Sequence, residues 1–201
     1  GVVTFVDVFA ISAIALLILP LGDIVVNAHQ VMLGLLGLMF MLPMSMASAF
    51  GILVSTKIGA EQIDAAWQLS KRALMAVMLI AIVVMLTIWG LDSWIVGLFS
   101  NDAQVITLAL ASILLMCWMH IFDALLVISL AMLRCWREIV RPMFIFISTV
   151  LVVGLGGDWY VAYHPMTLFN WQSNALVIHG FWWILSIAYT IAASLCFVCL
   201  L

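Results

Sequence analysis

Charged side chains are scarce in this 201-residue sequence, and their scarcity excludes most classes of soluble protein. Asp, Glu, Lys and Arg make up 7% of the residues, whereas 68% are hydrophobic. Soluble domains average about 25% charged and 45–50% apolar residues. Six Lys and Arg with a formal net charge of −3 leave no basic surface for nucleic acid. Four cysteines in apolar surroundings do not form a disulfide framework. The composition therefore predicts an all-α integral membrane protein that contacts the lipid bilayer.

Six apolar stretches are long enough to be transmembrane helices. They cover residues 2–21, 27–54, 72–91, 105–137, a stretch that starts after 142 and ends near 163, and 175–201. We expect them to form a single six-helix bundle over residues 1–201. The sequence opens at Gly1 in apolar residues, without the charged leader region of a signal peptide. We therefore expect it to be part of a longer polypeptide.

The positively charged residues orient these helices. All six lie in or beside two connections: Lys57, Lys71 and Arg72 where the second stretch leads to the third, and Arg134, Arg137 and Arg141 where the fourth leads to the fifth. By the positive-inside rule, both connections are cytoplasmic. An even number of spans then places both chain ends in the cytoplasm too. The sequence thus predicts a multi-pass protein of the inner (plasma) membrane.

Two acids within the apolar stretches are the candidate functional residues. Asp123 lies near the middle of 105–137, where a carboxylate costs about 2.5–3.5 kcal/mol on insertion scales. A proton, a bound cation or a substrate in an internal cavity would offset that cost, as would a neutral Asp hydrogen-bonded to a neighbouring helix. By helix rise, Asp7 lies about 21 Å and Asp123 about 27 Å below the same membrane surface. We predict that Asp7 and Asp123 share one site that binds a proton or a cation such as Na⁺, because two neighbouring carboxylates disfavour joint ionisation.

Several other residues are weaker candidates. The residues one or two turns from the two acids, which we expect to line a cavity, are Thr4, Met116, Met119 and His120. His120 suits a proton relay, although a packed histidine with one hydrogen-bond partner fits equally well. Pro43 removes a backbone hydrogen bond within 27–54 and predicts a helix kink.

The acids near the outer surface predict no further site. We expect Asp158 to be hydrated there, and Asn101 or Asp102 to cap the fourth helix. An intramembrane aspartyl protease that uses Asp123 and Asp158 is a competing interpretation. It needs Gly-x-Gly-Asp at the second acid, but the sequence from 155 to 158 is Leu-Gly-Gly-Asp. We therefore expect no enzymatic site at these two acids.

The sequence resembles a known transporter family in an ordered series of short motifs. They are AHQ, FMLPMS, KIG, LFSND, FDA and MLR, which follow one another between residues 28 and 134. In this order they resemble the carboxy-terminal half of multidrug and toxic compound extrusion (MATE) transporters of the bacterial multidrug branch. The segment GFWWILSIAYTIAAS extends the resemblance to the twelfth helix of that family.

The resemblance implies a function and a partner. MATE transporters are built from two six-helix lobes around a central cavity and export cationic or amphipathic compounds in exchange for Na⁺ or H⁺, without a prosthetic cofactor. The expected partners are therefore an amino-terminal six-helix lobe and a small-molecule substrate. The family's acids in the seventh and tenth helices match Asp7 and Asp123, although the first is usually Glu. Some relatives carry a cation-ligating Tyr where this sequence has Met119. A truncated remnant without transport activity, and an exporter of a lipid or metabolite, remain alternatives.

Overall fold

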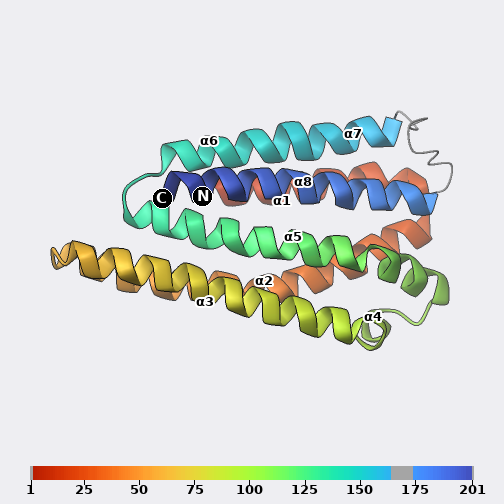
Figure 1. Cartoon of the computed structure of the whole chain (residues 1–201). Coiled ribbons are helices and arrows are strands. Elements are labelled where there is room, and N and C mark those ends of the chain that lie inside the picture. Colours follow the sequence, from red (N-terminus) through yellow and green to blue (C-terminus); the bar gives the residue numbers. More distant parts are fainter. Residues whose placement is uncertain (1, 164–173, 201) are drawn as a thin grey trace.

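The computed structural model describes residues 2–163 and 174–200, which form helices with no β-strand among them. Figure 1 shows the long helices side by side in one elongated bundle. In chain order the helices are α1 (Val2–Ile18), η1 (Leu19–Leu21), α2 (Asp23–Gly59), α3 (Ile63–Gly90), α4 (Asp92–Phe99), α5 (Ala103–Cys135), α6 (Val140–Ser148), η2 (Thr149–Leu155), α7 (Gly156–Tyr163) and α8 (Asn174–Leu200).

Five helical segments of the described chain are long and apolar enough to cross a membrane. They are Asp23–Gly59, Ile63–Gly90, Ala103–Cys135, Val140–Ala162 and Ile178–Leu200. The first predicted span is a shorter apolar helix, Phe5–Leu21. The prediction of an α-helical membrane bundle is therefore confirmed.

Helix α5 is the centre of the bundle. It contacts α2, α3, α4 and α8, and in Figure 1 it runs between α8 on one side and the α2–α3 pair on the other. Its start is fixed by Asp102, whose Oδ1 accepts a hydrogen bond of 2.8 Å from the backbone N–H of Gln104. This is the N-cap that the sequence predicted at Asn101 or Asp102. Because α5 is surrounded by other helices, the polar residues in its middle are buried against protein; they are Ser112, His120, Asp123 and Ser129.

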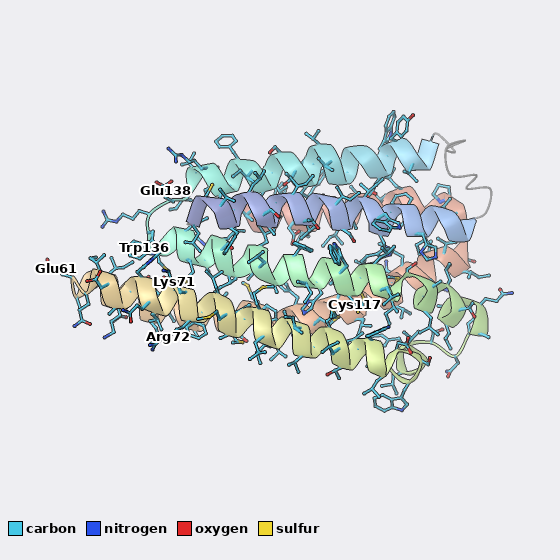
Figure 2. All side chains as sticks on the ribbon, in the orientation of Figure 1. Glu61, Lys71, Arg72, Cys117, Trp136 and Glu138 are labelled. Carbon is cyan, nitrogen blue, oxygen red and sulfur yellow. The ribbon has the colours of Figure 1, made fainter. Side chains whose placement is uncertain are left out.

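The positive charges gather at one end of the bundle, which we call the cationic end. The turns after α2 and after α5 lie there, as do the marked N and C ends of the chain (Figure 1). Lys71 and Arg72 lie on α3 itself, because that helix begins at Ile63 rather than at residue 72 (Figure 2). Lys57 is likewise in the last turn of α2, where its Nζ donates to Gln62 Oε1 at 2.8 Å. The helices therefore extend further than the apolar stretches that predicted them.

The fifth span is not a uniform α-helix. Residues Thr149–Leu155 form a π-helix between α6 and α7. Gly157 allows close packing on α8, because a Cβ there would lie 2.8 Å from Ile184 Cγ2, whereas a Cβ at Gly154 would make an ordinary contact of 3.6 Å with Ala188 Cβ. The absence of a side chain at Gly157 thus lets the backbone of this span lie against α8.

Candidate functional site

Asp7 and Asp123 line the same cavity. It has a volume of about 190 Å³ and lies among α1, α2, α5, η2 and α8. Its lining residues are Asp7, Ala10, Ile11, Leu33, Leu36, Gly37, Phe40, Met119, Asp123, Val150, Trp182, Leu185 and Tyr189. The two carboxylates therefore line one partly open and mostly apolar space.

The helix periodicity of α1 and α5 directs both acids inward. On α1, Val6, Ala10 and Ile14 are buried at intervals of four residues, and Asp7 stands beside this stripe. On α5, Asp123 is 8% exposed and lies one turn from Met119, which also lines the cavity. Each acid thus belongs to the packed face of its helix rather than to a lipid-facing one.

Tyr189 of α8 lines the same cavity as the two acids, and the sequence reasoning missed it. Its hydroxyl donates a hydrogen bond of 2.5 Å to Asp7 Oδ1. Its ring packs edge-on against Phe146 of α6, with centroids 6.4 Å apart. A phenol hydroxyl in the middle of a 27-residue apolar helix needs a polar partner. That need was the feature of the sequence that could have indicated Tyr189 as a site residue. The cavity therefore has a tyrosine hydroxyl, but it comes from α8 and contacts Asp7. Position 119 of α5, where some relatives carry tyrosine, is methionine here.

Only some of the other residues that we predicted to line the cavity do so. Met119 lines the cavity, but Met116 and His120 do not, although both are fully buried. Met116 is two turns, about 10 Å, along α5 from Asp123. His120 is rotated away from Met119 around the helix, so it points to different neighbours. The side chain of Thr4 lies outside the described part of the structure.

Pro43 is buried inside α2, which continues as one helix from Asp23 to Gly59. The kink expected there stays a prediction.

Two polar rings border the cavity without hydrogen bonds. Trp182 of α8 lines it, and its buried Nε1 has no partner among the described residues. The ring of His29 of α2 packs at a tilt of 52° against Trp182 with ring centroids 5.7 Å apart, and both ring nitrogens of His29 also have no partner in the described structure. Buried polar groups rarely stay unpaired in proteins. These rings therefore offer donors and acceptors to water or to a ligand beside the cavity.

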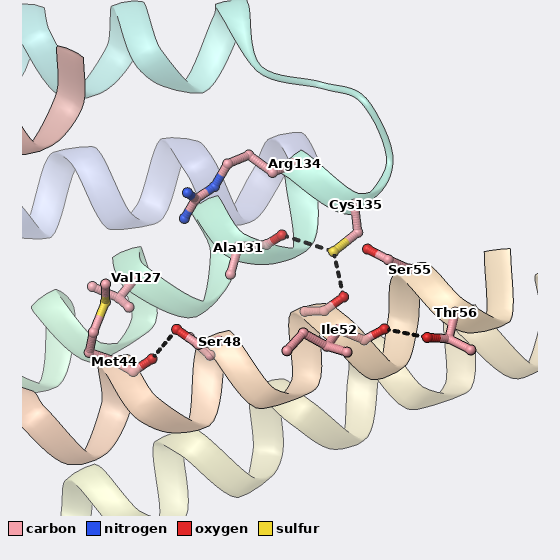
Figure 3. Close-up of a pocket in the computed structure, with 11 residues that line it drawn as sticks. Met44, Ser48, Ile52, Ser55, Thr56, Val127, Ala131, Arg134 and Cys135 are labelled. Atoms are coloured by element: carbon pink, nitrogen blue, oxygen red, sulfur yellow. Dashed lines mark hydrogen bonds between the residues drawn. The ribbon is translucent and has the colours of Figure 1, made fainter. Parts of the chain in front are cut away.

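A larger groove of about 660 Å³ opens between α2 and α5 near the cationic end (Figure 3). Its lining contains no carboxylate. Within it, Cys135 Sγ contacts the carbonyl oxygens of Gly51 at 3.4 Å and of Ala131 at 3.2 Å, and so joins the two helices. Arg134 is the one basic residue in the lining. This groove is therefore separate in place and in chemistry from the two acids.

Asp158 contradicts the sequence-based expectation. Instead of being hydrated, its side chain is 0% exposed, and neither carboxyl oxygen has a hydrogen-bond partner in the described structure. The expectation considered only depth along the helix. It could not foresee that Asp158 faces protein while its neighbours Trp159 and Tyr160 are exposed. Asp158 does not line the cavity with Asp123, so the two acids do not form a protease pair there.

The donor set of the cavity suits a proton or a hard cation. Two carboxylates and a phenol supply oxygen, which hard cations prefer, whereas transition metals favour nitrogen and sulfur. No group of three or more His, Cys, Asp or Glu side chains suited to a metal ion occurs among the described residues. The cavity residues therefore offer oxygen ligands to a proton or a hard cation.

Known proteins match most of this sequence. Residues 2–160 match the family model described as MatE. The multidrug resistance protein NorM of Aliivibrio fischeri is 32% identical over 178 residues, which are 89% of this chain and 38% of that protein. A probable multidrug resistance protein NorM of Chromobacterium violaceum is 32% identical over 195 residues, 97% of this chain and 41% of its own length. The multidrug resistance protein MdtK of Edwardsiella ictaluri is 32% identical over 178 residues, 89% of this chain and 38% of that protein. The chain thus spans about two fifths of the length of these relatives.

Proposed function

The chain belongs to the MatE family, and on that premise we propose that it forms one lobe of an ion-coupled multidrug exporter in which Asp7 and Asp123 bind the coupling ion. The observation that carries this proposal is the single cavity lined by both acids. The names of the relatives, which are multidrug resistance proteins, support the same activity.

The two carboxylates account for exchange between the ion and the drug. No Lys or Arg is present on α1 or α8, and those of α2 and α5 lie in the last turn of each helix. The acids therefore lack a fixed counter-ion, and a negative site in an apolar bundle attracts any available cation. Na⁺ or H⁺ from outside neutralises the acids and displaces a cationic drug. Loss of the ion on the inside restores the negative site.

The size of the cavity supports the need for a second lobe. Sites for drug-sized ligands occupy about 300–1,000 Å³, whereas this cavity has about 190 Å³. It accommodates an ion and several water molecules, so a drug needs further surface. We propose that an amino-terminal six-helix lobe supplies that surface, because the relatives are more than twice as long as the matched region. The substrates are then cationic or amphipathic compounds.

The cationic end faces the cytoplasm in this proposal, in agreement with the positive-inside rule. Both chain ends lie at the same end (Figure 1). Single cysteines at Arg137 and at Asp102, in a chain without its native cysteines, test this orientation. An impermeant thiol reagent added outside should label Asp102→Cys and leave Arg137→Cys unmodified. The reverse pattern would invert the topology.

Replacement of Asp123 tests the transport mechanism. Asp123→Asn keeps the size of the side chain and removes the charge that binds the ion. In the full-length transporter, an imposed Na⁺ or H⁺ gradient should then no longer drive drug out of vesicles, while the amount of inserted protein stays close to wild type. Asp102→Asn is the matched control, because Asn caps a helix as well as Asp does. Wild-type efflux in Asp123→Asn would refute the proposal, and so would loss of efflux in both variants.

A further inference from the structure

Asp158 is a buried acid that the proposed transport site does not use. It lies on α7, five residues before that helix ends at Tyr163 and at the end of the bundle opposite the cationic end. Its neighbours Trp159 and Tyr160 are 51% and 46% exposed, as aromatic residues at a membrane interface are. Asp158 itself is 0% exposed. The acid therefore lies close to the membrane surface in depth but is covered by protein.

The elements packed against α7 are α1, η2 and α8. Across these three, the titratable side chains are Asp7, His179, Tyr189, Cys196 and Cys199, and none is a Lys or Arg.

None of these groups is a partner for Asp158. Asp7 and Tyr189 are hydrogen-bonded to one another, and His179 Nδ1 lies 3.2 Å from the hydroxyl of Ser112. Both oxygens of Asp158 are without a hydrogen bond in the described structure. An ionised carboxylate in this position would be buried without a counter-charge, which is very unfavourable. The packing therefore requires the neutral, protonated acid.

The surroundings favour a proton over a metal cation. Metal cations such as Ca²⁺ need several oxygen ligands, whereas a proton needs one carboxyl oxygen. No second oxygen is bonded to Asp158, and the described residues contain no cluster of three or more metal-ligating side chains. A merely structural acid would be expected to donate its proton to a neighbouring carbonyl, and this one does not.

The backbone beside Asp158 is suited to a local opening. The π-helix η2 ends at Leu155, three residues before the acid, and π-turns within helices are frequent at functional sites. Gly157 presses against Ile184 so closely that a Cβ there would lie 2.8 Å from Ile184 Cγ2. Release of the proton would leave a charge in this contact. Water would have to enter, or α7 would have to move away from α8, before the acid could ionise.

We propose that Asp158 is a second proton-binding site, separate from the Asp7–Asp123 cavity, which exchanges its proton with the medium at the end opposite the cationic end. It loses that proton when the contact between α7 and α8 opens. The reaction is the ionisation of one carboxyl group to a carboxylate and a proton, and it needs no other reactant. This inference goes beyond the proposed function and stands or falls independently of drug transport.

Carbodiimide labelling tests the site directly. Dicyclohexylcarbodiimide reacts with protonated carboxyl groups in apolar surroundings, and mass spectrometry identifies the modified peptide. In the full-length protein in lipid vesicles, Asp158 should be modified, and its labelling should fall about tenfold per pH unit above the midpoint of its titration. Exposed Asp102 should stay unmodified. The label on Asp158 should persist when Asp7 and Asp123 are both replaced by Asn.

Two outcomes of the labelling would overturn the proposal. One is an unmodified Asp158 at every pH in a sample where Asp123 is modified. The other is loss of the label on Asp158 in the Asp7→Asn/Asp123→Asn protein, which would make it part of the transport site. Neither outcome depends on drug efflux, so failure of this inference is distinguishable from failure of the proposed function.

Thermal unfolding gives a second measurement. The folded protein keeps a proton on Asp158 that the unfolded chain releases above about pH 4, so the folded state loses stability as the pH rises. In Asp158→Asn this ionisation is absent. The difference in melting temperature between the wild type and Asp158→Asn should therefore change steadily with pH, to the disadvantage of the wild type at high pH. A difference that stays constant with pH would refute the proposal.

Discussion

Replacing Asp7 with Asn should weaken the binding of the coupling ion at Asp123 about thirtyfold. Asn keeps the size of the side chain and an oxygen that accepts the hydrogen bond from Tyr189. The link between α1 and α8 is therefore retained, and the negative charge is the main loss. Any change in ion affinity then reports the electrostatic contribution of Asp7 to the shared cavity.

The magnitude follows from the size of the cavity. A sphere of 190 Å³ is about 7 Å across, so Asp7 acts across roughly this distance on a cation bound at Asp123. At 8 Å and an effective dielectric constant of about 20, two unit charges interact by about 2 kcal/mol. Since 1.4 kcal/mol corresponds to a factor of ten, the expected loss is about thirtyfold in ion affinity. Salt screens this interaction weakly because the charges are buried.

The assay is drug efflux from vesicles that contain the full-length transporter. The measured quantity is the Na⁺ or H⁺ concentration that gives half-maximal efflux, compared among the wild type, Asp7→Asn and Asp102→Asn. The control removes an exposed carboxylate far from the cavity and should agree with the wild type within about twofold. Agreement of Asp7→Asn with the wild type to within the same margin would refute the idea that its charge acts on the ion site.

Two further substitutions test the packing around the site. Tyr189→Phe removes the hydrogen-bond donor of the half-buried Asp7 and should lower the free energy of unfolding by about 1–3 kcal/mol in ion-free protein. Added coupling ion should stabilise this variant more than the wild type, and equal stabilisation would contradict the role of the hydroxyl. Gly157→Ala places a methyl group 2.8 Å from the Cγ2 of the stiff Ile184 and should destabilise the protein by about 1–3 kcal/mol. Gly97→Ala meets no atom within 4 Å and should be neutral or slightly stabilising. Thermal unfolding in lipid or detergent measures all three, and equal effects of the two glycine substitutions would contradict the packing of α7 on α8.

The sequence predicted the spans well because hydrophobicity is a property of consecutive residues. Hydrophobicity marks the membrane-crossing part of a helix, not its full length. Helix α3 begins at Ile63, nine residues before the apolar stretch, because backbone hydrogen bonding continues into the polar sequence that precedes the stretch. The π-helix at Thr149–Leu155 was not foreseen either, since no residue pattern in that apolar segment distinguishes π-turns from α-turns.

By itself the sequence determined the position of each acid along its helix and the end of the bundle that carries the cations, because the rise per residue is constant along a helix. Only the tertiary structure decided what each side chain faces, because that depends on how each helix is rotated against its neighbours. Asp7 and Asp123 turn to one cavity, and Tyr189 reaches them from a helix more than 60 residues further along the chain than Asp123. For Asp158, too, the sequence and the tertiary structure determined different properties. Its position near the membrane surface follows from its place in the sequence, whereas its complete burial follows from the contact between α7 and α8.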